Sequence, residues 1–526
     1  MNRLGNPWVL ALLVGLYPAL FNASNNWFMF EPAQGVAAFG SVVLVTFVTL
    51  CGVYAALRVA GRLASKLLPA DRPNLSSALE RAERSIFAAA CLAVLCFLMR
   101  QTLAELLPGG VGLAGVAAAL VAAGLAYRST PARGELGVLG GLGAALGLLC
   151  LASLAGGLYS IVTTARPGAG ALAGEGDLAR WGEVRLRERP DVYFIVPDGY
   201  PSRTALRAVF GIDDGGLEEG LAAQGFTEYD GVFSNYMYTV SSISASLGMR
   251  HHQYRGNVGN AELLGGRPFI TSDRNPVVHV FRNNGYQVSY VHQSEYLFTM
   301  GCGIDLCSPT PAWVDALELL PGFLRRAFAG DRSLPSLERR ALAQIDAALA
   351  TDTPQFLYIH FQAPNHSLTF EQSREELAAF RSTFGDRIQT ANATLLSLVG
   401  RILSRDDDAL IIVSADHGAW GFGTTMWAEH SVLESVPDPL IALDHLGVRL
   451  AIRWPSGEPP DGAPIRSNVN LFRHVLAYLS GNDALLKDLA PDDGYLVRGR
   501  GDESVILQAV LDGEPLERLR VVPPVP

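Results

Sequence analysis

An aspartate–histidine–glycine triplet follows a short apolar stretch in the last third of the chain. The segment Ala409–Gly418 reads ALIIVSADHG, and its five apolar residues with a β-branched centre predict a buried strand. Asp416 and His417 come at the carboxyl end of that strand, which is the edge of an open α/β sheet where ligands bind. A carboxylate and an imidazole at that edge can both turn toward one divalent metal ion. The alternative is an ordinary polar turn.

A second predicted strand ends in the same way. The segment Asp191–Val196 reads DVYFIV and is closed by PDGY, so Asp198 followed by a glycine stands at its carboxyl end. Two buried strands that each end in a metal-capable acid favour a shared site over an isolated polar turn.

Further chemically capable groups lie between and beyond these strands. Thr239 ends the polar loop SNYMYT and enters a predicted helix, His366 lies in PNHSLTF, and His430 lies in WAEHS. A threonine hydroxyl is a weak nucleophile until metal coordination lowers its pKa. Imidazoles suit contacts to substrate oxygens or proton transfer. The alternative for Thr239 is a helix N-cap with no other role.

Two more histidines lie at the ends of predicted strands. His292 ends the strand Gln287–His292 and is a candidate for contact with substrate. His360 lies within the strand Gln355–Phe361, and we expect it to be a packed strand residue.

These groups require a scaffold that brings strand ends together. Apolar strands alternate with helical patterns from residue 189 onward, which predicts an α/β fold with a mostly parallel central sheet in one domain, 189–526. The predicted strands are 191–196, 226–233, 287–292, 355–361, 409–413 and 448–454, and the main helices are 202–210, 275–284, 337–350, 371–403 and 471–479.

The amino-terminal third is apolar enough to lie in a membrane. Crossing the hydrocarbon core takes roughly 17–25 residues, and five stretches reach or approach that length. They are Pro7–Ala23, Val36–Leu57, Ile86–Met99, Val111–Tyr127 and Leu136–Ala165. The alternative for the last two, which are rich in glycine and alanine, is a pair of buried soluble helices. We therefore expect a transmembrane domain of five helices over 1–165 and a linker over 166–188.

Basic residues orient these spans. The loop after the second stretch is rich in arginine, the loop after the fourth carries Arg128 and Arg133, and the loop 24–35 has no basic residue. Because basic loops stay in the cytoplasm, the amino terminus is expected inside and everything after Ala165 outside. This predicts a multi-pass membrane protein whose larger domain lies on the side away from the cytoplasm.

The cysteines indicate the compartment of the exported part, and the net charge limits the kinds of binding partner. Cys302 and Cys307 lie in GCGIDLC in the exported part, where a short-loop disulfide fits an oxidising compartment. The alternative is a pair of metal thiolates. The formal net charge is −10 and no Lys/Arg-rich block occurs, so nucleic acid is not an expected partner.

Taken together, PDGY, SNYMYT, PNHSLTF and SADHG resemble the alkaline-phosphatase superfamily. Within it, the chain looks like membrane-anchored sulfatase-like proteins such as lipoteichoic acid synthases and phosphoethanolamine transferases. That resemblance implies that Asp198, Thr239, Asp416 and His417 ligate one divalent metal ion, Zn or Mn before Mg or Ca. It also makes Thr239 the nucleophile. His366 and His430 suit contacts to substrate oxygens or to a second metal ion, and an imidazole could also protonate the leaving group.

The resemblance implies a metal-dependent transferase. Such an enzyme moves a phosphoglycerol- or phosphoethanolamine-type group from a membrane phospholipid, through a phospho-threonine, to an envelope glycan or lipid. The chain departs from the pattern in three ways: the sulfatase Cys/Ser-x-Pro-x-Arg signature is absent near Thr239, the first acid is Asp instead of Glu, and Ala419–Phe422 replaces a Glu-rich continuation. The alternatives are a phosphoester or sulfate-ester hydrolase and a non-catalytic envelope assembly or binding module.

Overall fold

The structure is a computed structural model that divides into two compact units, an amino-terminal helical unit and a larger α/β unit. It describes residues 6–26, 32–67, 73–99, 138–163, 175–252, 267–272, 275–293, 304–308, 333–367, 373–425, 433–455, 464–499 and 504–522.

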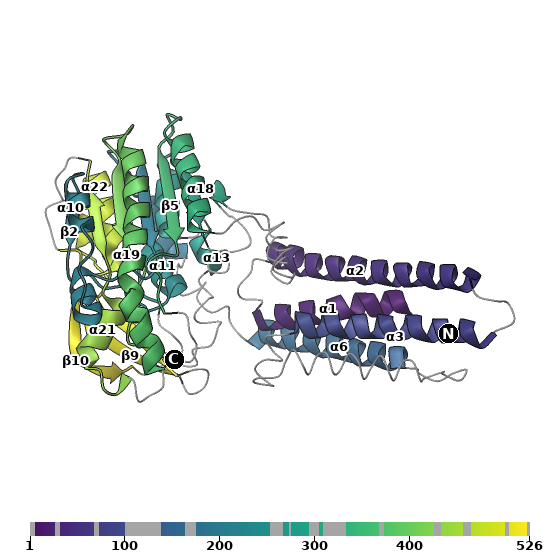
Figure 1. Cartoon of the computed structure of the whole chain (residues 1–526). Coiled ribbons are helices and arrows are strands. Elements are labelled where there is room, and N and C mark those ends of the chain that lie inside the picture. The colour runs from purple at the N-terminus through teal and green to yellow at the C-terminus, as the bar shows by residue number, and fades with distance from the viewer. Residues whose placement is uncertain are drawn as a thin grey trace. The chain divides into compact units, whose positions relative to one another are not determined.

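The amino-terminal unit consists of long helices packed on one another (Figure 1). They are α1 (Pro7–Asn26), α2 (Pro32–Leu67), α3 (Pro73–Leu98) and α6 (Val138–Thr163). Leu10 and Phe87 are buried between them, whereas Leu148 of α6 is 68% exposed and Leu44 of α2 is 62% exposed. Large aliphatic side chains on the outside of a helical bundle favour a lipid environment over water.

Three of these helices are long and apolar enough to cross a membrane, judged by length and composition. The spans are Pro7–Ser24, Val42–Lys66 and Gly141–Tyr159. They correspond to the first, second and fifth stretches expected from the sequence. The third stretch forms the second half of α3, whose first half carries charged residues, and α3 does not reach the same length of apolar sequence. The fourth stretch lies outside the described residues.

The larger unit is built on a seven-stranded sheet in the order β2-β7-β6-β1-β5-β3-β4. Strands β6, β1, β5, β3 and β4 run parallel, and β7 is antiparallel to both of its neighbours. The mostly parallel central sheet expected from the sequence is therefore confirmed. The strands are β1 (Val192–Pro197), β2 (Thr227–Tyr229), β3 (Gln287–His292), β4 (Leu306–Ser308), β5 (Gln355–Phe361), β6 (Leu410–Ser414) and β7 (Leu450–Arg453).

Helices cover both faces of this sheet (Figure 1). The longer ones are α8 (Glu175–Gly182), α11 (Thr239–Gly248), α14 (Pro276–Asn283), α18 (Leu334–Ala348), α19 (Arg374–Leu403), α21 (Asp438–Leu446) and α22 (Asn468–Ser480). Shorter helical segments are Arg203–Ala205, Leu206–Phe210 (a π-helix), Leu217–Ala222, Arg267–Ile270 and Asp483–Leu486. Ser373 caps α19 in a capping box with Glu376, which explains where this helix begins.

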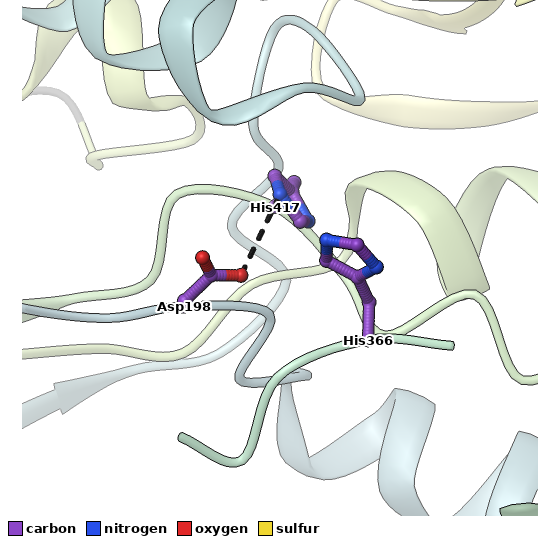
Figure 2. A group of neighbouring side chains, drawn as sticks. All are labelled: Asp198, His366 and His417. Atoms are coloured by element: carbon purple, nitrogen blue, oxygen red, sulfur yellow. Dashed lines mark ion pairs between the residues drawn. The ribbon is translucent and has the colours of Figure 1, made fainter. Parts of the chain in front are cut away.

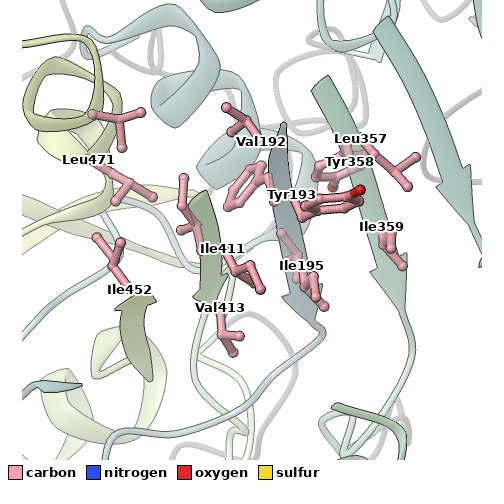
Figure 3. Packing of buried hydrophobic residues seen from close by; sticks show 14 of the residues in the cluster. Val192, Tyr193, Ile195, Leu357, Tyr358, Ile359, Ile411, Val413, Ile452 and Leu471 are labelled. Atoms are coloured by element: carbon pink, nitrogen blue, oxygen red, sulfur yellow. The ribbon is translucent and has the colours of Figure 1, made fainter. Parts of the chain in front are cut away.

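The central strands are buried on both faces, so their sequences are continuous apolar runs (Figure 3). Phe194 of β1 packs against Tyr358 of β5 and Phe472 of α22, with ring centroids 5.3 and 5.1 Å apart. This core fixes the register of β1 against β5 and β6, and the register in turn sets which residues emerge together at the strand ends.

Two parts of this unit differ from the sequence expectation. The second half of the expected linker forms α8 and the segment after it, and Trp181 and Leu186 are buried in the main core, so packed structure precedes residue 189. A separate antiparallel sheet of β8 (Gly494–Arg498), β9 (Val505–Leu511) and β10 (Glu514–Val521) was not predicted. Its last strand is charged and largely exposed, so it has no apolar pattern that would predict a strand.

The cysteines of the described segments follow the expected division. Cys307 is disulfide-bonded, whereas Cys51, Cys91, Cys96 and Cys150 are free. The other cysteine of the expected pair, Cys302, lies outside the described residues.

Asp191 precedes β1 and makes the stability of the sheet depend on pH. Its Oδ1 accepts from the backbone N–H of Gln355 at 2.8 Å, at the start of β5. Burial raises the pKa of Asp191 to about 6, although this hydrogen bond opposes the shift. The folded state therefore favours the neutral acid, and the resulting stabilisation is lost as pH rises from about 4 through 6.

We predict that Asp191→Asn, which keeps the accepting oxygen but cannot ionise, stabilises the protein at pH 8 and has little effect at pH 4. The expected gain at pH 8 is about 1 kcal/mol, because Asp191 is partly open to solvent. Thermal unfolding followed from pH 4 to 8 measures it, with Asp386→Asn, an exposed acid of α19, as the control. Parallel curves for wild type and Asp191→Asn would contradict the prediction.

Candidate metal centre

The chemically capable side chains meet at the carboxyl ends of the central parallel strands. Asp198 follows β1, Asp416 and His417 follow β6, and His366 lies in the loop after β5. Figure 2 shows the Asp198 carboxylate facing the imidazoles of His417 and His366. Thr239 is the first residue of α11.

The donor atoms of these residues lie close enough to share one ion. The Nε2 atom of His417 is 3.4 Å from Asp416 Oδ2, 3.8 Å from Asp198 Oδ1 and 3.1 Å from the Thr239 hydroxyl. Two ligands of a metal with bonds of ~2.0–2.2 Å lie about 3–4 Å apart. The four residues expected to form one metal site are thus brought together, while their role as ligands stays a prediction.

Backbone contacts hold the two acidic loops in register. The backbone N–H groups of Gly199 and His417 both donate to Asp416 Oδ1 at 3.0 Å, which leaves Oδ2 facing the other donors. Gly199 has a φ of +66°, which a glycine adopts without strain, and a Cβ at this position would lie 3.1 Å from the carbonyl carbon of Asn365. Because Asn365 N–H donates to the carbonyl of Asp198 at 2.9 Å, the loop carrying His366 is attached to the loop carrying Asp198.

Both imidazoles have Nδ1 turned to a backbone carbonyl, so Nε2 is the nitrogen available to the site. His417 Nδ1 lies 2.8 Å from the carbonyl of Gly418, and His366 Nδ1 lies 2.9 Å from the carbonyl of Ser367. A carbonyl can only accept, so Nδ1 of each ring carries a proton, and Nε2 is the nitrogen whose lone pair is free when the ring is neutral. This is the tautomer that a metal ligand or a proton acceptor requires.

The position of Thr239 excludes the helix-cap alternative. The N-cap of α11 is Tyr238, and the Thr239 hydroxyl points to His417 instead of capping its own helix. All ten residues of α11 are buried, so this hydroxyl is held at the amino end of a fully packed helix. Unpaired N–H groups at that end favour negative charge.

The electrostatics of the site fit a divalent cation. Asp198 and Asp416 are both buried. Neither Oδ1 of Asp198 nor Oδ2 of Asp416 accepts a hydrogen bond from the described residues. Burial and the charge of Asp416 raise the pKa of Asp198 well above its usual value. Burial also opposes ionisation of Asp416, but His417 and His360 more than offset it and lower the pKa of Asp416. A cation between the two carboxylates would supply the missing positive charge.

His360 is packed in strand β5, as the sequence predicts, and its side chain also lies beside this cluster. Its Nε2 is 3.7 Å from Asp416 Oδ2 and 3.9 Å from Asp198 Oδ2, and its side chain is fully buried. Donor atoms of Asp198, His360 and Asp416 form one metal-capable group, and those of Asp198, His366 and His417 form another. The sequence signal that could have identified it is a polar residue near the end of an otherwise apolar buried strand.

The remaining candidates stand apart from the described cluster. His292 is buried at the end of β3 and pairs in register with His360, but it is in neither metal-capable group of described residues. Its expected contact with substrate stays a prediction. His430 lies outside the described residues.

A second layer, not expected from the sequence, supports the histidines. Trp420 stacks on His366 and His417, with ring centroids 3.8 and 5.1 Å apart. Asp444 of α21 holds the loop that carries Trp420, because its two oxygens accept from the N–H groups of Gly421 and Phe422 at 2.7 and 2.9 Å.

Glycine is required in the Asp-His-Gly triplet because the backbone of α21 lies against it. A Cβ at Gly418 would overlap the carbonyl oxygen of Asp444. The Gly418 N–H also donates to the carbonyl of His445 at 2.9 Å, so α21 approaches the strand end closely.

The chain is similar to several solved structures, each at low sequence identity and with a low TM-score. The zinc complex of the C-terminal periplasmic domain of EcEptC from Escherichia coli is 11% identical, with a TM-score of 0.37 over 56% of this chain and 83% of that one. The phosphonate monoester hydrolase of Agrobacterium radiobacter is 13% identical, with a TM-score of 0.41 over 62% and 88%. The integral membrane lipooligosaccharide phosphoethanolamine transferase A of Neisseria meningitidis is 14% identical, with a TM-score of 0.34 over 90% and 95%.

Sequence comparison gave a more direct result. No curated protein sequence matches the chain. The family model described as Sulfatase matches residues 217–481, which include Thr239, the loop after β5 and the Asp-His-Gly triplet. The match covers half of the chain, and the protein belongs to the sulfatase family.

Proposed function

We propose that the protein is a metal-dependent transferase that moves a phospho-alcohol group, of the phosphoglycerol or phosphoethanolamine type, from a membrane phospholipid to an envelope glycan or lipid. The observation that carries the proposal is the buried group of Asp198, Asp416 and His417 around the Thr239 hydroxyl. The apolar helices of the amino-terminal unit support a place at the bilayer, which would supply the donor. We place the enzyme in the bacterial inner membrane with the α/β unit on the periplasmic side.

Asp198, Thr239, Asp416 and His417 would hold the ion. Two carboxylates, a hydroxyl and an imidazole suit Zn or Mn better than Mg or Ca, because imidazole is a ligand that the latter two rarely take. When bound, the ion acts as a Lewis acid that favours the alkoxide of Thr239 and neutralises charge on the phosphoryl group.

The residues of the chain then account for transfer in two steps. In the first, Thr239 Oγ1 loses its proton and bonds to phosphorus, the bond from phosphorus to the diacylglycerol oxygen breaks, and that oxygen takes up a proton. In the second, an acceptor hydroxyl bonds to phosphorus as it loses its proton, and the bond to Thr239 Oγ1 breaks. Thr239 regains a proton, so the enzyme returns to its starting state.

His366 suits the role of proton acceptor. Burial and the neighbouring His417 lower the pKa of His366 to about 3, so the imidazole is neutral at pH 7 with Nε2 unprotonated. A neutral imidazole can take the proton of the acceptor hydroxyl in the second step. So low a pKa also makes His366 a weak base, and protonation of the leaving oxygen is the alternative role for this imidazole.

A hydrolase of the same family differs only in the acceptor, which is then water. Sulfate-ester hydrolysis is less favoured, since the Cys/Ser-x-Pro-x-Arg signature is absent around Thr239. A non-catalytic module is disfavoured because buried carboxylates without counter-charge cost stability unless they serve a ligand.

The function is tested with the purified full-length protein and labelled phosphatidylglycerol or phosphatidylethanolamine, each with and without Mn²⁺ or Zn²⁺. The proposal expects a metal-dependent adduct on Thr239 in mass spectra and label in an added acceptor. Free phospho-alcohol released at the rate of donor loss, with no acceptor labelled, would show a hydrolase. Absence of any adduct with every metal and donor would count against the proposal.

We predict that the Thr239 hydroxyl cannot be replaced by other helix-compatible groups. Thr239→Ala and Thr239→Asn should lower kcat by roughly 10³-fold or more, while Thr239→Ser keeps part of the activity. Because the residues act as a unit, Thr239→Ala combined with Asp416→Ala should be no worse than either change alone. Ser244→Ala, further along α11, is the control. An active Thr239→Asn protein would overturn the nucleophile assignment.

We predict that His360, which lies beside the two carboxylates, contributes to metal affinity. His360→Gln should weaken binding of Mn²⁺ or Zn²⁺ about 10–100-fold, the usual cost of losing a group that orients metal ligands. Competition with a chromophoric chelator measures this without any need for turnover. His474→Gln, an equally buried histidine of α22, controls for general loss of packing. Equal affinities of the His360→Gln protein and wild type would make His360 a packed strand residue.

A further inference from the structure

Two arginines of α19 reach the loops that carry the histidines and Trp420. The Nη1 atom of Arg381 donates to the carbonyl of Gly421 at 2.6 Å, and the Nη1 atom of Arg387 donates to the carbonyl of Pro364 at 3.5 Å. Each guanidinium also lies over an aromatic ring, Arg381 over Phe422 at 5.5 Å and Arg387 over Phe380 at 5.1 Å. Cation–π contacts of this kind hold a guanidinium in place while leaving its edge open to other partners.

Neither arginine is paired with a carboxylate in the described part of the chain, although α19 carries acidic neighbours. The ion pairs found there join other arginines, such as Arg401 at the far end of α19, which pairs with Asp346. Arg381 is half-buried and lies in the field of the buried Asp444, which offsets part of its charge. Arg387 is exposed, and no carboxylate of the described segments forms an ion pair with it. The net charge of −10 makes uncompensated cations beside the site more notable.

Arg387 lies next to the loop that carries His366. Its carbonyl partner, Pro364, is two residues before His366, and the charge of Arg387 reaches that imidazole. Arg381 lies next to the other loop, through Gly421, one residue after Trp420. The two cations therefore lie beside the two loops that carry His366 and Trp420, and we call these two loops the rim of the site.

We propose that Arg387, with Arg381 beside it, binds a second anionic group of the substrate, a phosphate, sulfate or carboxylate that is separate from the phosphoryl group reacting at Thr239. This rests on the proposed function. A guanidinium carries five N–H donors in a planar fork, which matches the oxygens of such a group. No carboxylate of the described segments accepts a hydrogen bond from Arg387, so its donors can serve a bound anion.

The proposal narrows the substrate class. A donor lipid with a single phosphate has only its reacting group, so the second anion belongs either to an anionic acceptor or to a donor lipid with two anionic groups. Both sources share the chemistry that Arg387 recognises, and experiment distinguishes them.

The first test measures binding alone, on the full-length protein loaded with Mn²⁺. Propyl phosphate and propane-1,3-diyl bisphosphate differ only by the second phosphate, and calorimetry gives both dissociation constants. Wild type should bind the bisphosphate about tenfold more tightly, with a preference that weakens as salt rises. Arg387→Ala should remove the preference and leave propyl phosphate binding unchanged. Arg387→Lys should keep only part of it, because it lacks the planar fork.

Arg401→Ala is the matched control, since it removes the same charge from the same helix far from the rim. If Arg387→Ala keeps the bisphosphate preference, or Arg401→Ala loses it equally, the proposal is overturned. Because no turnover is needed, this result stands even if the adduct on Thr239 is never found. Suppose that Arg387→Ala loses the bisphosphate preference and that neither wild type nor any variant shows turnover. This result would refute the proposed function and still support the anion site.

The second test identifies the source of the anion. With phosphatidylglycerol as donor, propane-1,3-diol and its monophosphate serve as a neutral and an anionic acceptor. If the acceptor supplies the anion, Arg387→Ala should raise KM for the monophosphate about tenfold and leave KM for the diol and kcat unchanged. If the donor supplies it, KM should rise instead for a donor lipid with two phosphates. Equal rises for charged and neutral acceptors and for both donors would contradict a second anion site.

Discussion

The structure of the site depends on one electrostatic conflict, the burial of two carboxylates side by side. Asp198 and Asp416 are both excluded from water, and each keeps one oxygen without a hydrogen-bond donor among the described residues. Burial and the neighbouring negative charge of Asp416 both oppose ionisation of Asp198 and raise its pKa. A folded protein tolerates such a pair only with a compensating charge, and a divalent cation is the most compact one.

The parallel sheet is what makes this conflict possible. Because β1, β5 and β6 are parallel and adjacent, the residues that follow them emerge at one edge of the sheet. The apolar core between the strands and α22 keeps that edge from shifting, and the Gly199 and His417 N–H groups orient the Asp416 carboxylate. The stability of the packed core thereby offsets the repulsion between the Asp198 and Asp416 carboxylates. Groups with strongly shifted pKa values are often found at functional sites.

The histidines and arginines extend the site outward from this buried pair. His417 joins the carboxylates to Thr239, and His366 presents an unprotonated Nε2 beneath Trp420. Arg387 then adds positive charge at the rim. The side chains of the site thus change from buried carboxylates through imidazoles to the exposed guanidinium of Arg387.

The sequence by itself determined the apolar strands, the acids and the Asp-His-Gly triplet that follow them, the threonine, and the alternation that predicts a parallel sheet. These features depend on residues that are close together along the chain, so the sequence alone can show them. Only the tertiary structure decided that His360 faces the carboxylates, that Asp444 holds the loop of Trp420, and that arginines of α19 reach the rim. Each of those contacts joins segments brought together by packing, and the exposed, charged β10 owes its strand form to its neighbour β9.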